Sequence, residues 1–173
     1  MLRFSDSAGL RPTPDRVRET LFNWLGQDLS GLTCLDLFAG SGALGFEAAS
    51  RGAQKVVLVE TDPKVAAALE ENRRNLGAGE PLEIVRTDAV KFATSTQMRF
   101  DVLFLDPPYK QGWIDRVVPL LDRILVDDAV IYVEAERTLA ACGKWSTVKQ
   151  GRTGQVHYHL MRRQLPQGEP IDA

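Results

Sequence analysis

The feature that most constrains the fold is a regular alternation of short apolar runs with amphipathic helical segments. Helical patterns cover residues 43–51, a stretch that begins at Asp62, and residues 113–125, where Pro119 predicts a kink or a second helix start. Strands joined by helices run parallel and carry helices on both faces. The alternation therefore predicts one α/β domain with a mostly parallel sheet. Five runs have the length and composition of buried strands: 33–38, 55–60, 82–85, 100–105 and 129–134.

The two ends of this alternation carry their own signals. Thr13, Pro14 and Asp15 predict a helix start, with Thr13 at the N-cap and Pro14 at the first helical position, and Gly26 predicts the end of that helix. After the last strand, "KWSTVKQ" and "QVHYHLM" flank "GRTG". This pattern predicts an antiparallel hairpin on one edge of the sheet.

Composition excludes several classes of protein. No apolar run approaches the roughly 20 residues that span a bilayer, and the formal net charge of -2 argues against a broadly basic protein. Cys34 and Cys142 are too few for a disulfide framework or a zinc site, which favours a cytoplasmic setting. His157 and His159 share one side of the expected edge strand and are interpreted as exposed residues, so no metal is expected.

A glycine-rich turn follows the first strand. Gly40, Gly42 and Gly45 form a G-x-G-x-x-G between a predicted strand and a predicted helix, and Glu60 ends the next strand twenty positions after Gly40. Glycines allow a tight turn and a close approach of backbone to a ligand, and the carboxylate can accept both hydroxyls of a ribose. Together they indicate a cofactor that contains adenosine.

The acidic residues around this turn indicate which cofactor. Asp36 lies four residues before Gly40, where its carboxylate would repel a pyrophosphate but attract a sulfonium or an amino group. This favours S-adenosylmethionine over a nicotinamide dinucleotide. Asp88 and Ala89 follow the third strand, where the Asp88 carboxylate is placed either for the adenine amino group or as a helix cap.

The fourth strand runs into Asp106-Pro107-Pro108-Tyr109. Neither proline has an N–H group, so the strand must end there. A carboxylate and an aromatic ring are then held in fixed geometry at the strand end. We interpret this tip as a pocket for the amino group of a nucleobase.

Several segments resemble the motifs of a known enzyme class. "LDLFAGSGALGFEA", "VLVETD", "RTDAV" and "DPPY" resemble the ordered motifs of class I S-adenosylmethionine-dependent N-methyltransferases. With "GLRPTPDRVRETLFNWL" and "VIYVEAE", the set resembles the RsmD-type bacterial 16S ribosomal RNA guanine-N2 methyltransferases, over about residues 9 to 163. The resemblance implies a Rossmann-like fold, a seven-stranded sheet with an antiparallel last strand, S-adenosyl-L-methionine as cofactor, and 16S rRNA or the small ribosomal subunit as partner.

The resemblance also implies domain limits and site residues. We expect a methyltransferase domain over 13–163 and a flexible tail over 164–173. Residues 1–12 are expected to form an N-terminal arm that is shorter than the basic arm of the family, so that the family's arm is either trimmed or lacking here. The base pocket is expected to contain Asp106, Pro107, Pro108 and Tyr109. The cofactor pocket is expected to contain Thr13, Arg16, Asp36, Phe38, Ala39, Gly40, Ser41, Gly42, Leu44, Gly45, Glu60, Thr61, Asp88 and Ala89.

Three alternatives stay open beside guanine N2 methylation by a monomer. The target could be adenine N6 or another exocyclic amine of a nucleic acid, the protein could be an NAD-dependent oxidoreductase, or it could be an RNA-binding domain without activity. The segment 144–163 contains two Lys and three Arg and no acidic residue. It is either a solvated edge or a surface that faces phosphate.

Overall fold

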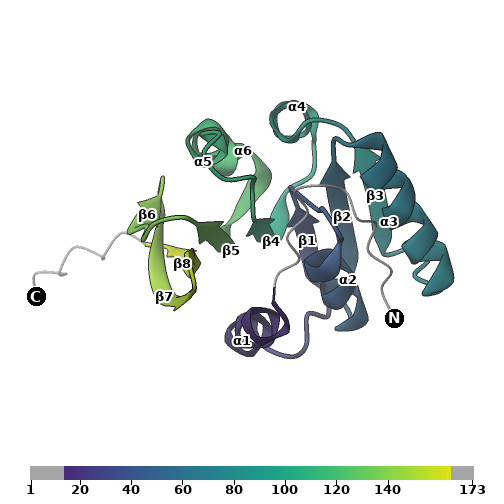
Figure 1. Cartoon of the computed structure of the whole chain (residues 1–173), viewed down its shortest axis with the longest axis horizontal. Helices are drawn as coiled ribbons and strands as arrows, with labels where there is room; N and C mark the ends of the chain where they lie inside the picture. The colour runs from purple at the N-terminus through teal and green to yellow at the C-terminus, as the bar shows by residue number, and fades with distance from the viewer. Residues whose placement is uncertain (1–13, 165–173) are drawn as a thin grey trace, which may run out of the picture.

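A computed structural model describes residues 14–164, and it has one eight-stranded sheet in the order β3-β2-β1-β4-β5-β8-β7-β6 (Figure 1). The pairs that join β1 to β5 are parallel, whereas β8, β7 and β6 pair antiparallel. This confirms the predicted Rossmann-like α/β sheet with its antiparallel hairpin. The strands are β1 (Thr33–Asp36), β2 (Lys55–Glu60), β3 (Leu82–Arg86), β4 (Phe100–Leu105), β5 (Leu125–Ala135), β6 (Ala141–Cys142), β7 (Trp145–Thr153) and β8 (Val156–Arg163).

The strand count exceeds the expected seven by one. The additional strand, β6, has two residues and pairs only with Trp145 and Ser146 at the start of β7. The chain reverses at Gly143, whose φ of 57° is in the left-handed region. A two-residue strand has no periodic pattern, so the sequence did not predict it.

Helices cover both faces of the sheet, and Figure 1 shows α4, α5 and α6 along one side with α1 and α2 along the other. Successive residues of a strand face opposite sides, and each side has its own hydrophobic core. Leu35, Leu103 and Ile131 pack in the core with α4, α5 and α6, whereas Cys34, Phe104 and Tyr132 pack with α1, α2 and α3. The helices are α1 (Asp15–Leu25), α2 (Ala43–Ser50), α3 (Pro63–Asn75), α4 (Ala89–Ser95), α5 (Trp113–Val117) and α6 (Leu121–Ile124).

Most predicted helix ends are confirmed. Asp62 caps α3, because its Oδ1 accepts the N–H groups of Lys64 at 2.8 Å and Val65 at 3.2 Å. A 3₁₀ turn, Val118–Leu120, contains Pro119 and separates α5 from α6, as a second helix start requires.

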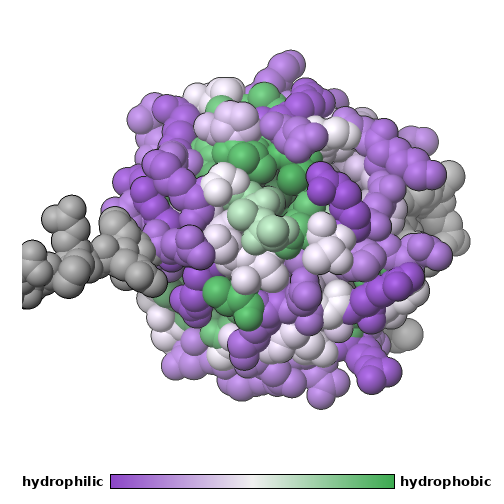
Figure 2. Space-filling model, turned by 90° about the vertical axis from the view of Figure 1, so that its left-hand side faces the viewer, coloured by the Kyte–Doolittle hydropathy of each residue, from purple (hydrophilic) through white to green (hydrophobic). Residues whose placement is uncertain are grey.

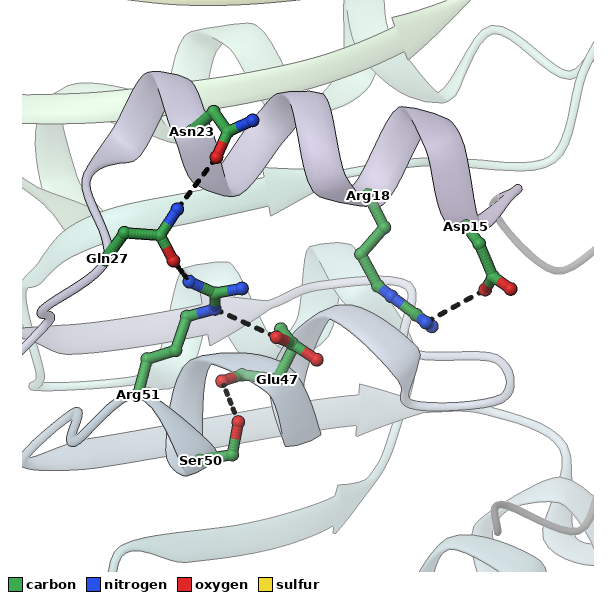
Figure 3. A network of polar contacts seen from close by, with 7 residues as sticks. All are labelled: Asp15, Arg18, Asn23, Gln27, Glu47, Ser50 and Arg51. Carbon is green, nitrogen blue, oxygen red and sulfur yellow. Dashed lines mark hydrogen bonds and ion pairs between the residues drawn. The ribbon is translucent and has the colours of Figure 1, made fainter.

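The first helix starts one residue later than predicted. Pro14 is its N-cap rather than its first helical residue, and Thr13 lies outside the described residues. Gly26, at φ 101°, ends the helix as predicted. Figure 3 shows how α1 is fixed to α2: Arg51 contacts both Glu47 of α2 and Gln27 beyond the end of α1.

The prediction that His159 is exposed on an edge strand is wrong. β8 lies between β5 and β7, so it is an inner strand. His159 is fully buried, its Nε2 accepts the Leu139 N–H at 3.0 Å, and its Nδ1 lies 3.3 Å from the Val133 carbonyl. His157 is half-buried, with Nδ1 3.3 Å from the Thr138 hydroxyl. The return strand of the hairpin, β8, pairs with β5, and the first strand, β7, lies on its outer side.

The hairpin forms one end of the molecule, and Figure 2 shows this end as an apolar area surrounded by polar and charged side chains. Two of its five cations are paired with acids from elsewhere: Lys144 lies 2.7 Å from Asp122, and Arg163 lies 2.6 Å from Asp127. Its other cations, Lys149, Arg152 and Arg162, are exposed. Among residues 14–164, no helix is long and apolar enough to cross a membrane.

Candidate active site

The glycine turn lies between β1 and α2 and supports close packing. Gly42 has φ 79°, and a Cβ there would lie 2.6 Å from Leu69 and from Phe46. A Cβ on Gly45 would lie 2.9 Å from Leu58 of β2. Real Cβ atoms do not approach other atoms so closely, so α2 reaches the sheet only because these positions lack side chains. This is the helix-packing role of such glycines, and it places the turn above the end of β1.

Glu60 connects this turn to the end of β2. Its Oε2 accepts the N–H of Gly40 at 2.9 Å, and its Oε1 accepts the N–H of Asp62 at 3.0 Å. Each carboxylate oxygen has a further lone pair. Glu60 is therefore held in one orientation by backbone hydrogen bonds and can accept further hydrogen bonds.

Asp36, the last residue of β1, is almost fully buried, with 2% exposed. Its Oδ2 accepts the Gly45 N–H at 3.2 Å. Burial raises the pKa of Asp36 to about 7; the Gly45 hydrogen bond opposes this shift, and the negative charges of Glu60 and Glu134 add to it. Near neutral pH, Asp36 is thus ready to ionise when a cation binds next to it.

Asp88 is a helix cap. Its Oδ1 accepts the N–H groups of Val90 at 2.9 Å and Lys91 at 3.1 Å at the start of α4. The cap, one of the two predicted roles, is confirmed, and Oδ2 takes part in neither bond. Ala89, the next residue, is buried.

The other predicted cofactor residues differ in their surroundings. Ala39 and Leu44 are buried in the core, whereas Gly40 and Ser41 are partly exposed. Phe38 packs edge-on against Trp113 of α5, with 5.3 Å between ring centroids. Arg16 is exposed in the first turn of α1, and Thr61 is exposed after β2.

Asp106 to Tyr109 follow β4, next to the glycine turn. Asp36 pairs with Phe104 across β1 and β4, so Asp106 begins two residues beyond the level of Asp36. Pro107, Pro108 and Tyr109 line a cavity of about 220 Å³ together with Trp113 and Ile114 of α5 and with Glu134, Glu136 and Arg137 from the end of β5 and the segment after it. The cavity is large enough for part of a nucleobase, and its lining is both aromatic and charged.

Glu134 is a site residue that the sequence analysis did not identify. Its neighbour Val133 pairs with Leu105 across β4 and β5, which places Glu134 beside Asp106. Glu134 is 4% exposed and accepts the Tyr132 hydroxyl at 2.8 Å. The signal that could have found it is an acidic residue at the end of an otherwise apolar strand, as at Glu60.

Burial raises the pKa of Asp106 well above its ordinary value, and the charge and hydrogen bond of Glu134 and the charge of Asp36 add to this effect.

Four acidic side chains, Asp36, Glu60, Asp106 and Glu134, lie at the carboxyl ends of adjacent parallel strands. Ligands of open α/β sheets bind at this edge. Among the described residues, no group of three or more His, Cys, Asp or Glu side chains could hold a metal ion.

Comparisons with known proteins agree with this geometry. The family model "Conserved hypothetical protein 95" matches residues 1–162. The "Ribosomal RNA small subunit methyltransferase D" of Escherichia coli K12 is 43% identical over 95% of this chain and 84% of its own length.

Solved structures share the fold. The yhhF protein from Escherichia coli has a TM-score of 0.81 at 43% identity, covering 90% of this chain and 88% of that one. An RNA methyltransferase from Salinibacter ruber, solved in complex with S-adenosyl-L-homocysteine, has a TM-score of 0.72 at 18% identity, covering 94% of this chain and 98% of that one. The matched residues include every motif around the four carboxyl groups, and the chain belongs to the Conserved hypothetical protein 95 family, which is the RsmD-type family of ribosomal RNA methyltransferases.

Proposed function

We propose that this protein transfers a methyl group from S-adenosyl-L-methionine to the exocyclic N2 of a guanine in 16S ribosomal RNA. The observation that carries the proposal is the position of Asp106, two residues beyond the level of Asp36, with a cavity that begins at Pro107. Trp113 of this cavity packs against Phe38, just before the glycine turn. A methyl acceptor and a methyl donor must lie within a few ångströms of each other for direct transfer. The name of the Escherichia coli relative supports ribosomal RNA as the substrate.

S-adenosyl-L-methionine fits the cofactor side of the site. Glu60 would bind the ribose hydroxyls, and Asp36 would balance the positive charge of the donor. The Oδ2 of Asp88, outside the bonds that cap α4, would accept the adenine amino group. The Salinibacter ruber methyltransferase, which shares the fold, was solved in complex with S-adenosyl-L-homocysteine, and this supports the assignment.

The base side of the site would activate a poor nucleophile. The lone pair of guanine N2 is delocalised into the ring. If Asp106 and the Pro107 carbonyl each accept one N–H of the amino group, the nitrogen becomes more pyramidal and its lone pair faces the methyl carbon. This is positioning together with electrostatic preorganisation.

The transfer itself is a direct displacement. The N2–methyl bond forms as the sulfur–methyl bond breaks, S-adenosylhomocysteine leaves, and N2 then loses a proton. Tyr109 would stack on the base, a contact of about 1–3 kcal/mol, and Pro108 would stiffen the turn. The base must be unpaired or flipped out to enter the cavity.

The RNA backbone would follow a basic track from the cavity to the hairpin. Arg137 lines the cavity and precedes Thr138, whose hydroxyl lies 3.3 Å from His157. His157 pairs with the exposed Arg152 across β8 and β7. We extend the proposal to a cytoplasmic monomer with a methyltransferase domain over 13–163. The proposed arm, 1–12, lies outside the described residues, and so does the proposed tail, 164–173, except for residue 164.

Radiolabelled methyl transfer tests the function directly. The substrates are small ribosomal subunits and free 16S rRNA from cells that lack this protein, followed by nucleoside analysis. We expect N2-methylguanosine. N6-methyladenosine would support the alternative target, tight NAD binding without S-adenosylmethionine binding would support an oxidoreductase, and RNA binding without transfer would support a silent binding domain.

A further inference from the structure

The Asp106–Glu134 contact has a chemical consequence for the proposed reaction. Both side chains are acidic, and they lie next to each other, one residue beyond the Leu105–Val133 pair of adjacent parallel strands. Two ionised carboxylates in such a site repel each other, and Glu134 is almost fully buried. This arrangement favours one proton held between them.

A third group fixes how that proton is held. The Tyr132 hydroxyl donates to Glu134 Oε1 at 2.8 Å, and Tyr132 is fully buried. Burial, followed by the charge and hydrogen bond of Glu134, raises the pKa of Tyr132, so the hydroxyl remains a donor. Glu134 therefore receives a hydrogen bond from Tyr132 and has Asp106 as its neighbour on the adjacent strand.

We propose that Asp106 and Glu134 work as one proton-sharing carboxyl pair, in which Glu134 is a positioning residue that orients Asp106 toward the amino group of the base. The proposal rests on the proposed methyl transfer. The shared proton occupies the side of Asp106 that faces Glu134. The other oxygen of Asp106 is then directed at the substrate as an acceptor.

The pair also provides a place for the proton that N2 loses. After transfer, the N2–H bond breaks and an O–H bond forms at Asp106, so that the pair holds two protons and is neutral. One of these protons then passes to solvent through the cavity, whose wall includes Glu134. No oxidant, reductant or further reactant is needed.

The surroundings favour retention of the shared proton. Asp36 of β1 adds a negative charge, and α1 presents apolar Val17 and Leu21 to this face of the sheet. The other titratable or charged groups that face the pair or its cavity are Tyr132, Tyr158, Lys110, Asp115, Arg116, Glu136 and Arg137. Lys110 and Arg137 are exposed, so water screens their charge.

Replacing Glu134 by glutamine and by alanine tests the pair. In Glu134→Gln, the amide N–H donates permanently to Asp106 and the amide oxygen accepts from Tyr132. We expect single-turnover transfer within about threefold of wild type at neutral pH. In Glu134→Ala, Asp106 loses its orientation, and we expect a loss of at least tenfold with unchanged S-adenosylhomocysteine affinity.

The pH profile separates this role from a structural one. The wild-type rate should fall at alkaline pH as the pair loses its shared proton, and Glu134→Gln should lack that component of the fall, because an amide does not ionise there. Ionisation of the substrate affects all variants equally. Asp128→Asn, at an exposed acid near the other end of β5, should keep the wild-type profile. The proposal is overturned if Glu134→Gln keeps the wild-type alkaline fall or loses as much rate as Glu134→Ala.

Infrared spectroscopy of the protein without RNA gives a second, independent readout. A component of the protonated-carboxyl band at neutral pH should disappear in Asp106→Asn and in Glu134→Gln but persist in Asp128→Asn. If it persists in all three, no shared proton exists. If the wild-type protein transfers no methyl group while the band behaves as expected, the proposed function fails and the pair stands.

Discussion

The two sides of the site give their acidic side chains different partners. On the cofactor side, Asp36, Glu60 and Asp88 accept hydrogen bonds from backbone N–H groups. On the base side, Asp106 lies beside a second acid, Glu134, and burial and this neighbour raise the pKa of Asp106. The contrast teaches that acidic side chains can take different roles because of their partners: in the proposed reaction, one set binds a cationic donor and the other an amino group.

The largest expected effect comes from replacing one acidic residue on the base side and one on the cofactor side. Asp106→Ala should reduce methyl transfer by about 10²–10³-fold, a magnitude typical for the loss of one preorganised contact. S-adenosylmethionine binding should change little, because Asp106 lies on the base side. Glu60→Ala should do the reverse and weaken cofactor binding. Calorimetry and single-turnover assays measure both, and a loss of cofactor binding in Asp106→Ala would contradict the division.

The next effect tests the packing that supports the cofactor side. Gly42→Ala places a methyl group 2.6 Å from Leu69 and Phe46 at a left-handed φ. We expect a loss of about 1–3 kcal/mol in the free energy of unfolding, with weaker cofactor binding, in denaturant titrations.

Gly77→Ala is the matched control for that substitution. Gly77 also has a left-handed φ, of 61°, but a Cβ there meets nothing within 4 Å. Its cost should be limited to backbone strain of about 1 kcal/mol. Equal losses in the two variants would show that close packing at Gly42 is not what limits stability.

A smaller effect concerns pH. The pKa of Asp36 is raised to about 7 in the folded protein, so its protonated form stabilises the fold at low pH, and that contribution is lost as pH rises through about 7. Asp36→Asn should therefore flatten the dependence of unfolding free energy on pH between the ordinary carboxyl pKa and about 7. Thermal melts across this range measure it, and an unchanged slope would contradict the assignment.

The same carboxyl group makes a prediction for the cofactor. The sulfonium of S-adenosylmethionine favours the ionised form of Asp36, whereas S-adenosylhomocysteine has no such charge. The ratio of wild-type affinities for these two ligands should therefore rise severalfold in favour of S-adenosylmethionine as pH rises through about 7. This preference should be absent in Asp36→Asn. Calorimetric titrations of both ligands test it.

The smallest effect concerns the proposed RNA track. Arg152→Ala should weaken RNA binding severalfold and reduce the salt slope by about one phosphate contact, while cofactor affinity is unchanged. Lys144→Ala is the matched control, because Lys144 is already paired with Asp122. Filter binding at several salt concentrations distinguishes them, and equal effects would argue against a track at Arg152.

Local sequence patterns were sufficient for much of the fold. Alternating apolar runs predicted the parallel strands. A helix start at Asp62 and a cap as one of two roles for Asp88 were also predicted, because a cap depends only on the two or three residues that follow. The glycine turn and DPPY were placed correctly at strand ends, because turn chemistry is also local. The roles of these residues toward ligands remain predictions.

The tertiary structure alone decided which strand ends meet. His159 became buried because β8 pairs with β5, and Glu134 came to lie beside Asp106 because β5 pairs with β4, although twenty-seven residues separate these two acids in the sequence. A residue pattern describes which face a side chain is on, but the neighbour across the sheet is set by strand order and register. The protonation of the Asp106–Glu134 pair depends on that neighbour, so it could be inferred only from the folded chain.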